Sequence, residues 1–239
     1  MRKSDFPLPA AYTQAFNASS RMAFEVDSRA LKESTESLLK AGRYPKGDSL
    51  KKHVDPRTYA FLRRFFELLN VPEQTLIQYK PWFIALLLQS AATHNEAPEA
   101  GVDEFFMRRA AKRSMPVVGL ETVQEHARVY SGLNDHDSEI LLLVTFIPSH
   151  NSVGNDTIMK AWRRGDAEAL AAIMQRDSAD APAFNVRILD ARNRAWIPKI
   201  EHFIASGQTY FVIVGAGHFG GPNGLLALLR ARGYQIEQL

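Results

Sequence analysis

Apolar residues recur at intervals of three and four along most of the chain, the pattern of helices with one buried face. This spacing predicts helices over residues 30–40, 56–69, 81–93, 102–113, 122–130, 139–146, 167–174, 192–205 and 222–232. Short runs rich in β-branched and aromatic residues predict strands at 22–26, 116–120, 210–214 and 234–239. Helical sequence separates each strand from the next. We therefore expect a helix-rich α/β fold in which helices cover a small, at least partly parallel sheet.

The middle of the chain is the longest part without a strand signal. We interpret residues 48–100, roughly, as a helical insertion or cap within a single domain of residues 1–239. Apolar residues nearly encircle the predicted helices at 65–69 and 81–88, so these helices must be covered on most sides. Packing within the core explains this pattern, and a homodimer interface is the alternative.

Composition excludes several classes of protein. The 29 Lys and Arg residues against 26 Asp and Glu leave a net charge of +3, and the basic residues are scattered, so we expect no nucleic-acid partner. We also expect no transmembrane segment, because no apolar run approaches the length of a membrane span. The first residues lack the apolar core of a signal peptide, and we expect a periplasmic or exported protein only if the true start lies upstream. The chain has no cysteine, so any metal must bind to His, Asp or Glu.

The glycines of the sequence YFVIVGAGHFGGPNG at 210–224 suggest a dinucleotide site. Gly215, Gly217 and Gly220 satisfy the pattern G-x-G-x-x-G. The full fingerprint also requires an acidic residue about 20 positions later, at the end of a second strand. The chain ends at Leu239 and Glu237 comes too soon, so the fingerprint is incomplete and we expect no nucleotide cofactor.

Polar residues stand at the carboxyl ends of three predicted strands. Glu25 lies near the end of the first, Glu121 follows the second, and His218 follows the third. A carboxylate within an apolar strand needs a partner, because an unpaired buried charge costs several kcal/mol or more. An arginine such as Arg192 could be that partner. A divalent ion such as Mn, Co or Zn, which accepts oxygen and imidazole ligands, is the other candidate.

Several motifs make the sequence similar to the TraB/PrgY/GumN family, to which the Tiki metalloproteases are related. These motifs, in order, are FPLP at 6–9, FEVD at 24–27, YKPW at 79–82, GVDEFF at 101–106, VVGLET at 117–122, WRRGD at 162–166, RNRAW at 192–196 and the glycine-rich segment at 214–234. The sequence GAGH at 215–218 resembles the second of two G-x-x-H motifs in that family. The first motif has no counterpart, and from this we expect either a start assigned too late or a naturally shortened member.

The resemblance implies a metal-dependent hydrolase that cleaves peptide bonds in a peptide or protein substrate. In this interpretation His218, Glu25 and Glu121 are the catalytic residues and the metal ligands, and one glutamate is the general base. Asp103, Arg192 and Asn193 would orient the ligands or the substrate, and Gly215 and Gly217 would let the backbone bend so that His218 faces the cleft. His94, His126 and His202 are expected at the surface. The alternative is a non-catalytic binding or scaffold protein that retains the fold.

Overall fold

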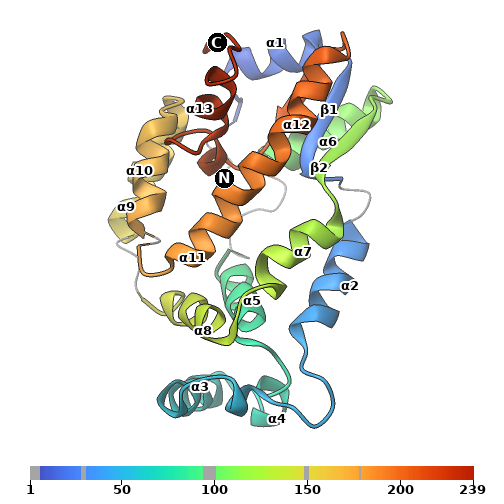
Figure 1. The fold of residues 1–239 in the computed structure, drawn as a ribbon. Helices are drawn as coiled ribbons and strands as arrows, with labels where there is room; N and C mark the ends of the chain where they lie inside the picture. Colours follow the sequence, from blue (N-terminus) through green and yellow to red (C-terminus); the bar gives the residue numbers. More distant parts are fainter. Residues whose placement is uncertain (1–5, 28–30, 94–100, 148–150, 178) are drawn as a thin grey trace.

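A small parallel sheet organises the upper half of the molecule (Figure 1). The structure, a computed structural model, describes residues 6–27, 31–93, 101–147, 151–177 and 179–239. Strands β1 (Arg21–Val26), β2 (Val117–Glu121) and β3 (Tyr210–Ile213) form an open sheet in the order β2-β1-β3, with both pairs parallel. The expected helix-rich α/β fold is confirmed. Because the strands are parallel, all three end at the same edge.

Helices make up most of the rest of the described chain. The α-helices are α1 (Ala10–Ala18), α2 (Leu31–Gly42), α3 (Pro56–Leu68), α4 (Glu73–Leu76), α5 (Pro81–Thr93), α6 (Val102–Lys112), α7 (Val123–Ser131), α8 (Asp135–Val144), α9 (Asn151–Arg163), α10 (Ala167–Asp177), α11 (Pro182–Asn185), α12 (Ala191–Ala205) and α13 (Leu225–Arg230). Short 3-10 turns cover Leu50–Lys52 and Ala216–His218. The sequence pattern predicted nine of these helices and missed α1, α4, α9 and α11.

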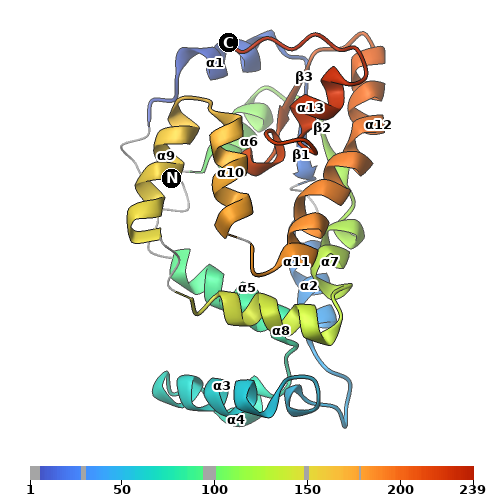
Figure 2. The ribbon, with the colours of Figure 1, turned by 60° about the vertical axis from the view of Figure 1, so that its left-hand side comes forward.

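The strand predicted at 234–239 is wrong, because these residues form no regular element. Gly233, with a φ of 86°, ends the turn after α13, and the tail then runs toward α1 (Figure 2). Tyr234 and Ile236 are partly buried while their neighbours are exposed. The alternation that suggested a strand therefore reflects contact along one side of an extended segment that pairs with no described strand.

The two faces of the sheet are covered by different helices. On one face, Met22, Phe24 and Phe211 pack with Phe16 of α1 and Phe106 of α6. On the other face, a second apolar cluster joins the sheet to α12 and α13; its buried members are Leu120, Trp196, Ile197 and Leu225. Burying large apolar side chains in this way contributes roughly 1.5–3 kcal/mol each, so the packing holds the strand ends in a constant position.

The helical end of the molecule lies away from the sheet, with α3 and α4 at its far extremity (Figures 1 and 2). Trp82, Ile84 and Ala85 of α5 are buried in one apolar cluster with Leu62 of α3 and Leu142 of α8. Core packing therefore accounts for much of the apolar surface of α5. No helix in the described ranges is both long and apolar enough to cross a membrane.

One irregular turn interrupts the segment that carries Arg192. The chain passes from α11 through a π turn at Val186–Asp190 directly into α12. A π turn holds one extra residue, and such turns occur frequently at functional sites. Here the carbonyl of Ile188, within the π turn, accepts a hydrogen bond from Arg192 Nη1 at 3.0 Å.

Candidate metal centre

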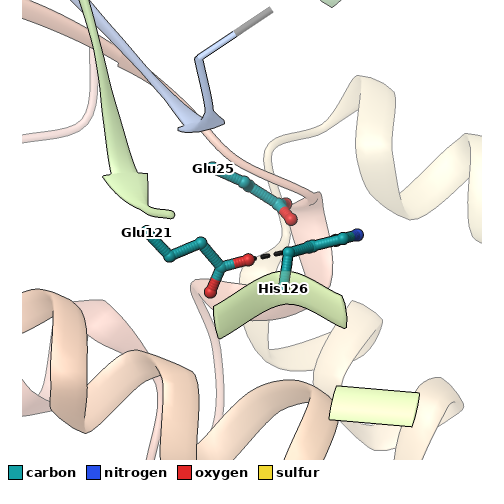
Figure 3. A group of neighbouring side chains, drawn as sticks. All are labelled: Glu25, Glu121 and His126. Atoms are coloured by element: carbon teal, nitrogen blue, oxygen red, sulfur yellow. Dashed lines mark hydrogen bonds and ion pairs between the residues drawn. The ribbon is translucent and has the colours of Figure 1, made fainter. Parts of the chain in front are cut away.

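Two glutamates meet at the carboxyl edge of the sheet, where parallel α/β folds place their ligands. Glu25 lies near the end of β1, and Glu121 is the last residue of β2. Glu121 is opposite Val26 in the pairing of the two strands, so the two glutamates are offset by one residue. Figure 3 shows both carboxylates directed toward the same point, together with His126 of α7. The side chain of Glu25 is 27% exposed, whereas that of Glu121 is 5% exposed.

Arg192 lies between the two carboxylates. Its Nη2 donates to Glu25 Oε2 at 2.5 Å and to Glu121 Oε1 at 2.7 Å, and its Nε donates to Glu121 Oε2 at 3.0 Å. The guanidinium also stacks over the ring of Trp196, with Cζ 4.6 Å from the ring centroid. The arginine partner considered from the sequence is therefore present, and it contacts both glutamates.

His126 is part of this centre, so the expectation of a surface position for it is wrong. Thr122 and Glu125 form a capping box that begins α7 immediately after β2. This start places His126 in the first turn, with Nδ1 2.7 Å from Glu121 Oε1. The sequence contained a signal for this position of His126. The motif T-x-x-E marks the start of the helix, and the residue that follows the glutamate packs back toward the residue before the helix, here Glu121. His202 is exposed as expected, and His94 lies outside the described residues.

His218 is buried beside the carboxylates, and its protonation pattern can be assigned from its neighbours. The Asn193 side chain donates to the carbonyl of Asn223 at 2.9 Å, so its Oδ1 faces His218 Nδ1 at 2.6 Å and accepts a hydrogen bond from it. The hydrogen is thus on Nδ1, and the lone pair of Nε2 faces Arg192 Nη1 at 3.2 Å. Nε2 is also 3.8 Å from Glu25 Oε1. Asn193 therefore holds the imidazole in the form that metal ligation requires.

The electrostatics keep both glutamates ionised. Burial alone would raise the pKa of Glu121, but the hydrogen bonds from His126 and Arg192 outweigh burial and lower it to about 2. Burial opposes ionisation of Glu25 too, and the charge of Arg192 with the backbone N–H of Gly215 lowers the pKa of that carboxyl. Burial, the largest cause, lowers the pKa of His218 to about 4, so its imidazole is neutral near pH 7.

The remaining predicted residues surround the centre. Asp103 of α6 lines a groove beside the centre, where desolvation, and then the nearby charge of Glu25, raise the pKa of its carboxyl. Gly215 has an ordinary φ of −53°, and its N–H donates to Glu25 Oε1 at 2.7 Å. Gly217 has no positive φ either, but a Cβ there would collide with Met174. The atoms nearest to this Cβ belong to the flexible end of the Met174 side chain, and Gly217 lacks a positive φ that would support the backbone bend expected from the sequence.

The donor set suits a divalent cation, because hard oxygen ligands and imidazole bind Mn, Co and Zn. Glu25, Glu121 and His126 each offer one ligand atom, and these atoms lie within 4.8 Å of one another. The same three residues surround Arg192 Nη2, which is 3.5 Å from His126 Nδ1 in addition to its two carboxylate contacts. The residues fit a metal ion in type and spacing, and the ion and the guanidinium would compete for one position.

Comparison with known proteins adds the family. The model of the TraB/PrgY/gumN family matches residues 1–238. The chain belongs to this family. An uncharacterized protein of Treponema pallidum (strain Nichols) is 23% identical to this TraB/PrgY/gumN chain over 237 residues, covering 91% of the chain and 70% of the relative. No solved structure is significantly similar to the chain.

Proposed function

We propose that this TraB/PrgY/gumN protein is a metal-dependent hydrolase that cleaves peptide bonds. The observation that carries the proposal is the gathering of two ionised carboxylates and the imidazole of His126 around one guanidinium nitrogen, Arg192 Nη2, at the carboxyl edge of a parallel sheet. The imidazole of His218 lies beside this group, with Nε2 3.8 Å from Glu25 Oε1. Such a concentration of negative charge favours a cation. The resemblance to the Tiki metalloproteases supports peptides as the substrate class.

The residues of the centre divide into different roles. Glu121 is the structural anchor, since Arg192, His126 and the indole N–H of Trp196 fix its carboxylate. Glu25 is more accessible and ionised, so it is the better base: it accepts a proton from the attacking water and passes it to the leaving amine. A bound divalent cation polarises the scissile carbonyl and lowers the pKa of water. His218, oriented by Asn193, presents the lone pair of Nε2 to the same space.

The position of Arg192 favours a second candidate, a binding or scaffold protein without turnover. Arg192 satisfies both glutamates without any metal, and its hydrogen bonds to Ile188 and Glu121 hold the guanidinium in place. If the guanidinium stays there in solution, the position for a cation remains closed. The two candidates therefore differ in whether a divalent cation displaces Arg192.

Metal binding followed by peptide hydrolysis tests the proposal. After dialysis against EDTA, the wild type is titrated with Mn²⁺, Co²⁺ and Zn²⁺ by calorimetry, and the same titrations are made with Glu121→Gln and His126→Asn. We expect near-stoichiometric binding that weakens by about 10-fold or more when a ligand is lost. His202→Asn, which changes an exposed histidine, is the matched control and should bind as the wild type does.

Hydrolysis is then measured on a peptide library with and without the tightest-binding metal. We expect turnover that requires the metal and is abolished by Glu25→Gln. Stoichiometric metal binding without turnover on any peptide would leave the metal centre standing but refute peptide hydrolysis as its activity. Failure of the wild type to bind any of the three metals would refute the metal-dependent hydrolase.

A further inference from the structure

A groove of about 350 Å³ runs beside β3, and the candidate metal centre does not account for it. β3 is an edge strand of the described sheet, since its one strand neighbour is β1. Six consecutive residues, 211–216, line the groove, and they face Tyr12 of α1, Val102 and Asp103 of α6, Trp162 of α9 and Phe219. Its volume is within the range of ligand-binding pockets.

The groove must follow the open backbone edge of β3. Successive side chains of a strand point to opposite faces of the sheet. Phe211 and Ile213 pack in the cluster with α1 and α6, while Val212 and Val214 pack in the cluster with α12 and α13. A hollow that touches all of these residues cannot lie on one face, so it lies along the edge, where the backbone itself is accessible.

The hydrogen-bonding groups along this edge follow from the pairing with β1. The carbonyl of Thr209 accepts from the N–H of Arg21, so Thr209 directs its backbone groups toward β1. In a parallel ladder this direction alternates along the strand. Phe211 and Ile213 therefore also face β1, whereas the N–H and C=O groups of Val212 and the N–H of Val214 face the groove.

The groove ends at the candidate metal centre, and its end is acidic. Gly215, the last strand-side residue of the lining, donates its N–H to Glu25 Oε1 at 2.7 Å. Asp103 lines the same end, and it is close enough to Glu25 for their charges to interact. A ligand with an extended backbone forms hydrogen bonds with the free N–H and C=O groups of the β3 edge. The rings of Tyr12, Trp162 and Phe219 contact its apolar side chains, and a positively charged group of the ligand complements the acidic end of the groove.

We propose that the open edge of β3 binds an extended peptide as an additional strand, with a lysine, an arginine or the free amino end of the peptide beside Asp103 and Glu25. The inference rests on the proposed function for its choice of a substrate peptide as the ligand. Strand addition supplies affinity through the main chain, and the pockets along the groove select alternate side chains. The bound backbone leads directly to Glu25, where the scissile bond has to lie.

Fluorescence anisotropy in EDTA tests the inference separately from metal binding and hydrolysis. The probe is a fluorescein-labelled peptide with an amino-terminal lysine followed by alternating threonine and valine. The matched probe carries N-methyl groups on alternate residues, which removes the donors of one peptide edge. We expect the methylated peptide to bind at least about 10-fold more weakly, because it cannot donate main-chain hydrogen bonds to the strand edge.

Two variants locate the site on the protein. Val212→Pro removes an outward-facing N–H without breaking the ladder to β1, and proline is tolerated at such edge positions. We expect it to weaken binding about 10-fold, whereas Val212→Ala, which keeps the N–H, changes binding by less than about threefold. Asp103→Asn should weaken the lysine peptide but not a peptide that begins with acetyl-glutamate.

Three results would overturn the inference. Equal binding of the methylated and unmethylated peptides would show that no strand is added. Undiminished binding to a folded Val212→Pro protein, checked by circular dichroism, would place the peptide elsewhere. A dimer that dissociates on Val212→Pro would show that a second copy of the chain occupies the edge. Peptide binding without turnover would leave strand addition standing and count against the hydrolase instead.

Discussion

Replacing Arg192 with methionine separates the two readings of the centre more sharply than any other single change. The variant keeps an unbranched side chain that can pack on Trp196, and it removes the charge that contacts both Glu25 and Glu121. Leaving a buried charge without its partner costs about 3–5 kcal/mol. In EDTA we therefore expect Arg192→Met to lose about 3–5 kcal/mol of unfolding free energy.

A divalent cation should restore much of this loss. With the guanidinium gone, the carboxylates are free, and a ligand at 100 times its dissociation constant stabilises the folded state by about 2.7 kcal/mol. The wild type should gain less, because Arg192 Nη2 occupies the same position. The assay is urea unfolding followed by circular dichroism at 222 nm, with EDTA in one series and Mn²⁺ in the other.

Arg194→Met is the control for this experiment. Arg194 lies in the same helix but is exposed and contacts Asn223 instead of the carboxylates. Its replacement should change the unfolding free energy by no more than about 0.5 kcal/mol in either series. Equal stabilisation of the wild type and Arg192→Met by Mn²⁺, or a loss below about 1 kcal/mol in EDTA, would refute the competition between guanidinium and metal.

Further predictions concern pH, a glycine and a second charged cluster. Buried His218 is neutral in the folded protein, and this contributes stability that is present above the unfolded pKa of 6.5 and is lost as pH falls toward the folded pKa of about 4. In EDTA the wild type should therefore lose up to about 3 kcal/mol more unfolding free energy than His218→Asn between pH 7 and 4. Parallel losses of the two proteins in urea titrations would contradict this. Gly220→Ala should greatly reduce the folded fraction, because the new Cβ would collide with the backbone of Ala167. Gly215→Ala should remain folded, because its Cβ would be 3.3 Å from Glu25 Oε1, and thermal unfolding distinguishes the two variants. His53 bridges Asp135 and Asp48 at 2.8 Å each, and mainly the hydrogen bond to Asp135 raises its pKa. The bridge should therefore stabilise the protein fully below pH 6.5 and less as pH rises through the folded pKa, so the stability difference from His53→Asn, about 1 kcal/mol or less, should be smaller at pH 9 than at pH 6.

Hydrophobic periodicity was sufficient to predict the strands of the sheet and nine of the helices. The three strands are short runs of β-branched and aromatic residues buried by helices on both faces, which is a strong local signal. The missed α9 begins with the polar sequence NSVGND, in which no apolar stripe is visible. The final segment failed for the opposite reason, since Tyr234 and Ile236 alternate with polar residues but have no strand to pair with.

The candidate centre was only partly predictable. Glu25, Glu121 and His218 come together because parallel strands end at one edge, and that argument needs only the strand order in the sequence. The contact of Arg192 with both glutamates depends on the π turn before it, which no periodicity indicates. His126 was missed because it was judged as a helix residue, without the capping box that directs it toward Glu121.

The most direct test of a metal at this centre is a crystal of the protein soaked in Mn²⁺ and measured for anomalous scattering. We predict an anomalous peak between Glu25 and Glu121, bonded to Glu121 and to an imidazole nitrogen of His126 or His218, with the guanidinium of Arg192 displaced and Glu25 left beside the ion as the base. A density map in which Arg192 still bridges both carboxylates at saturating Mn²⁺, with no peak between them, would contradict it.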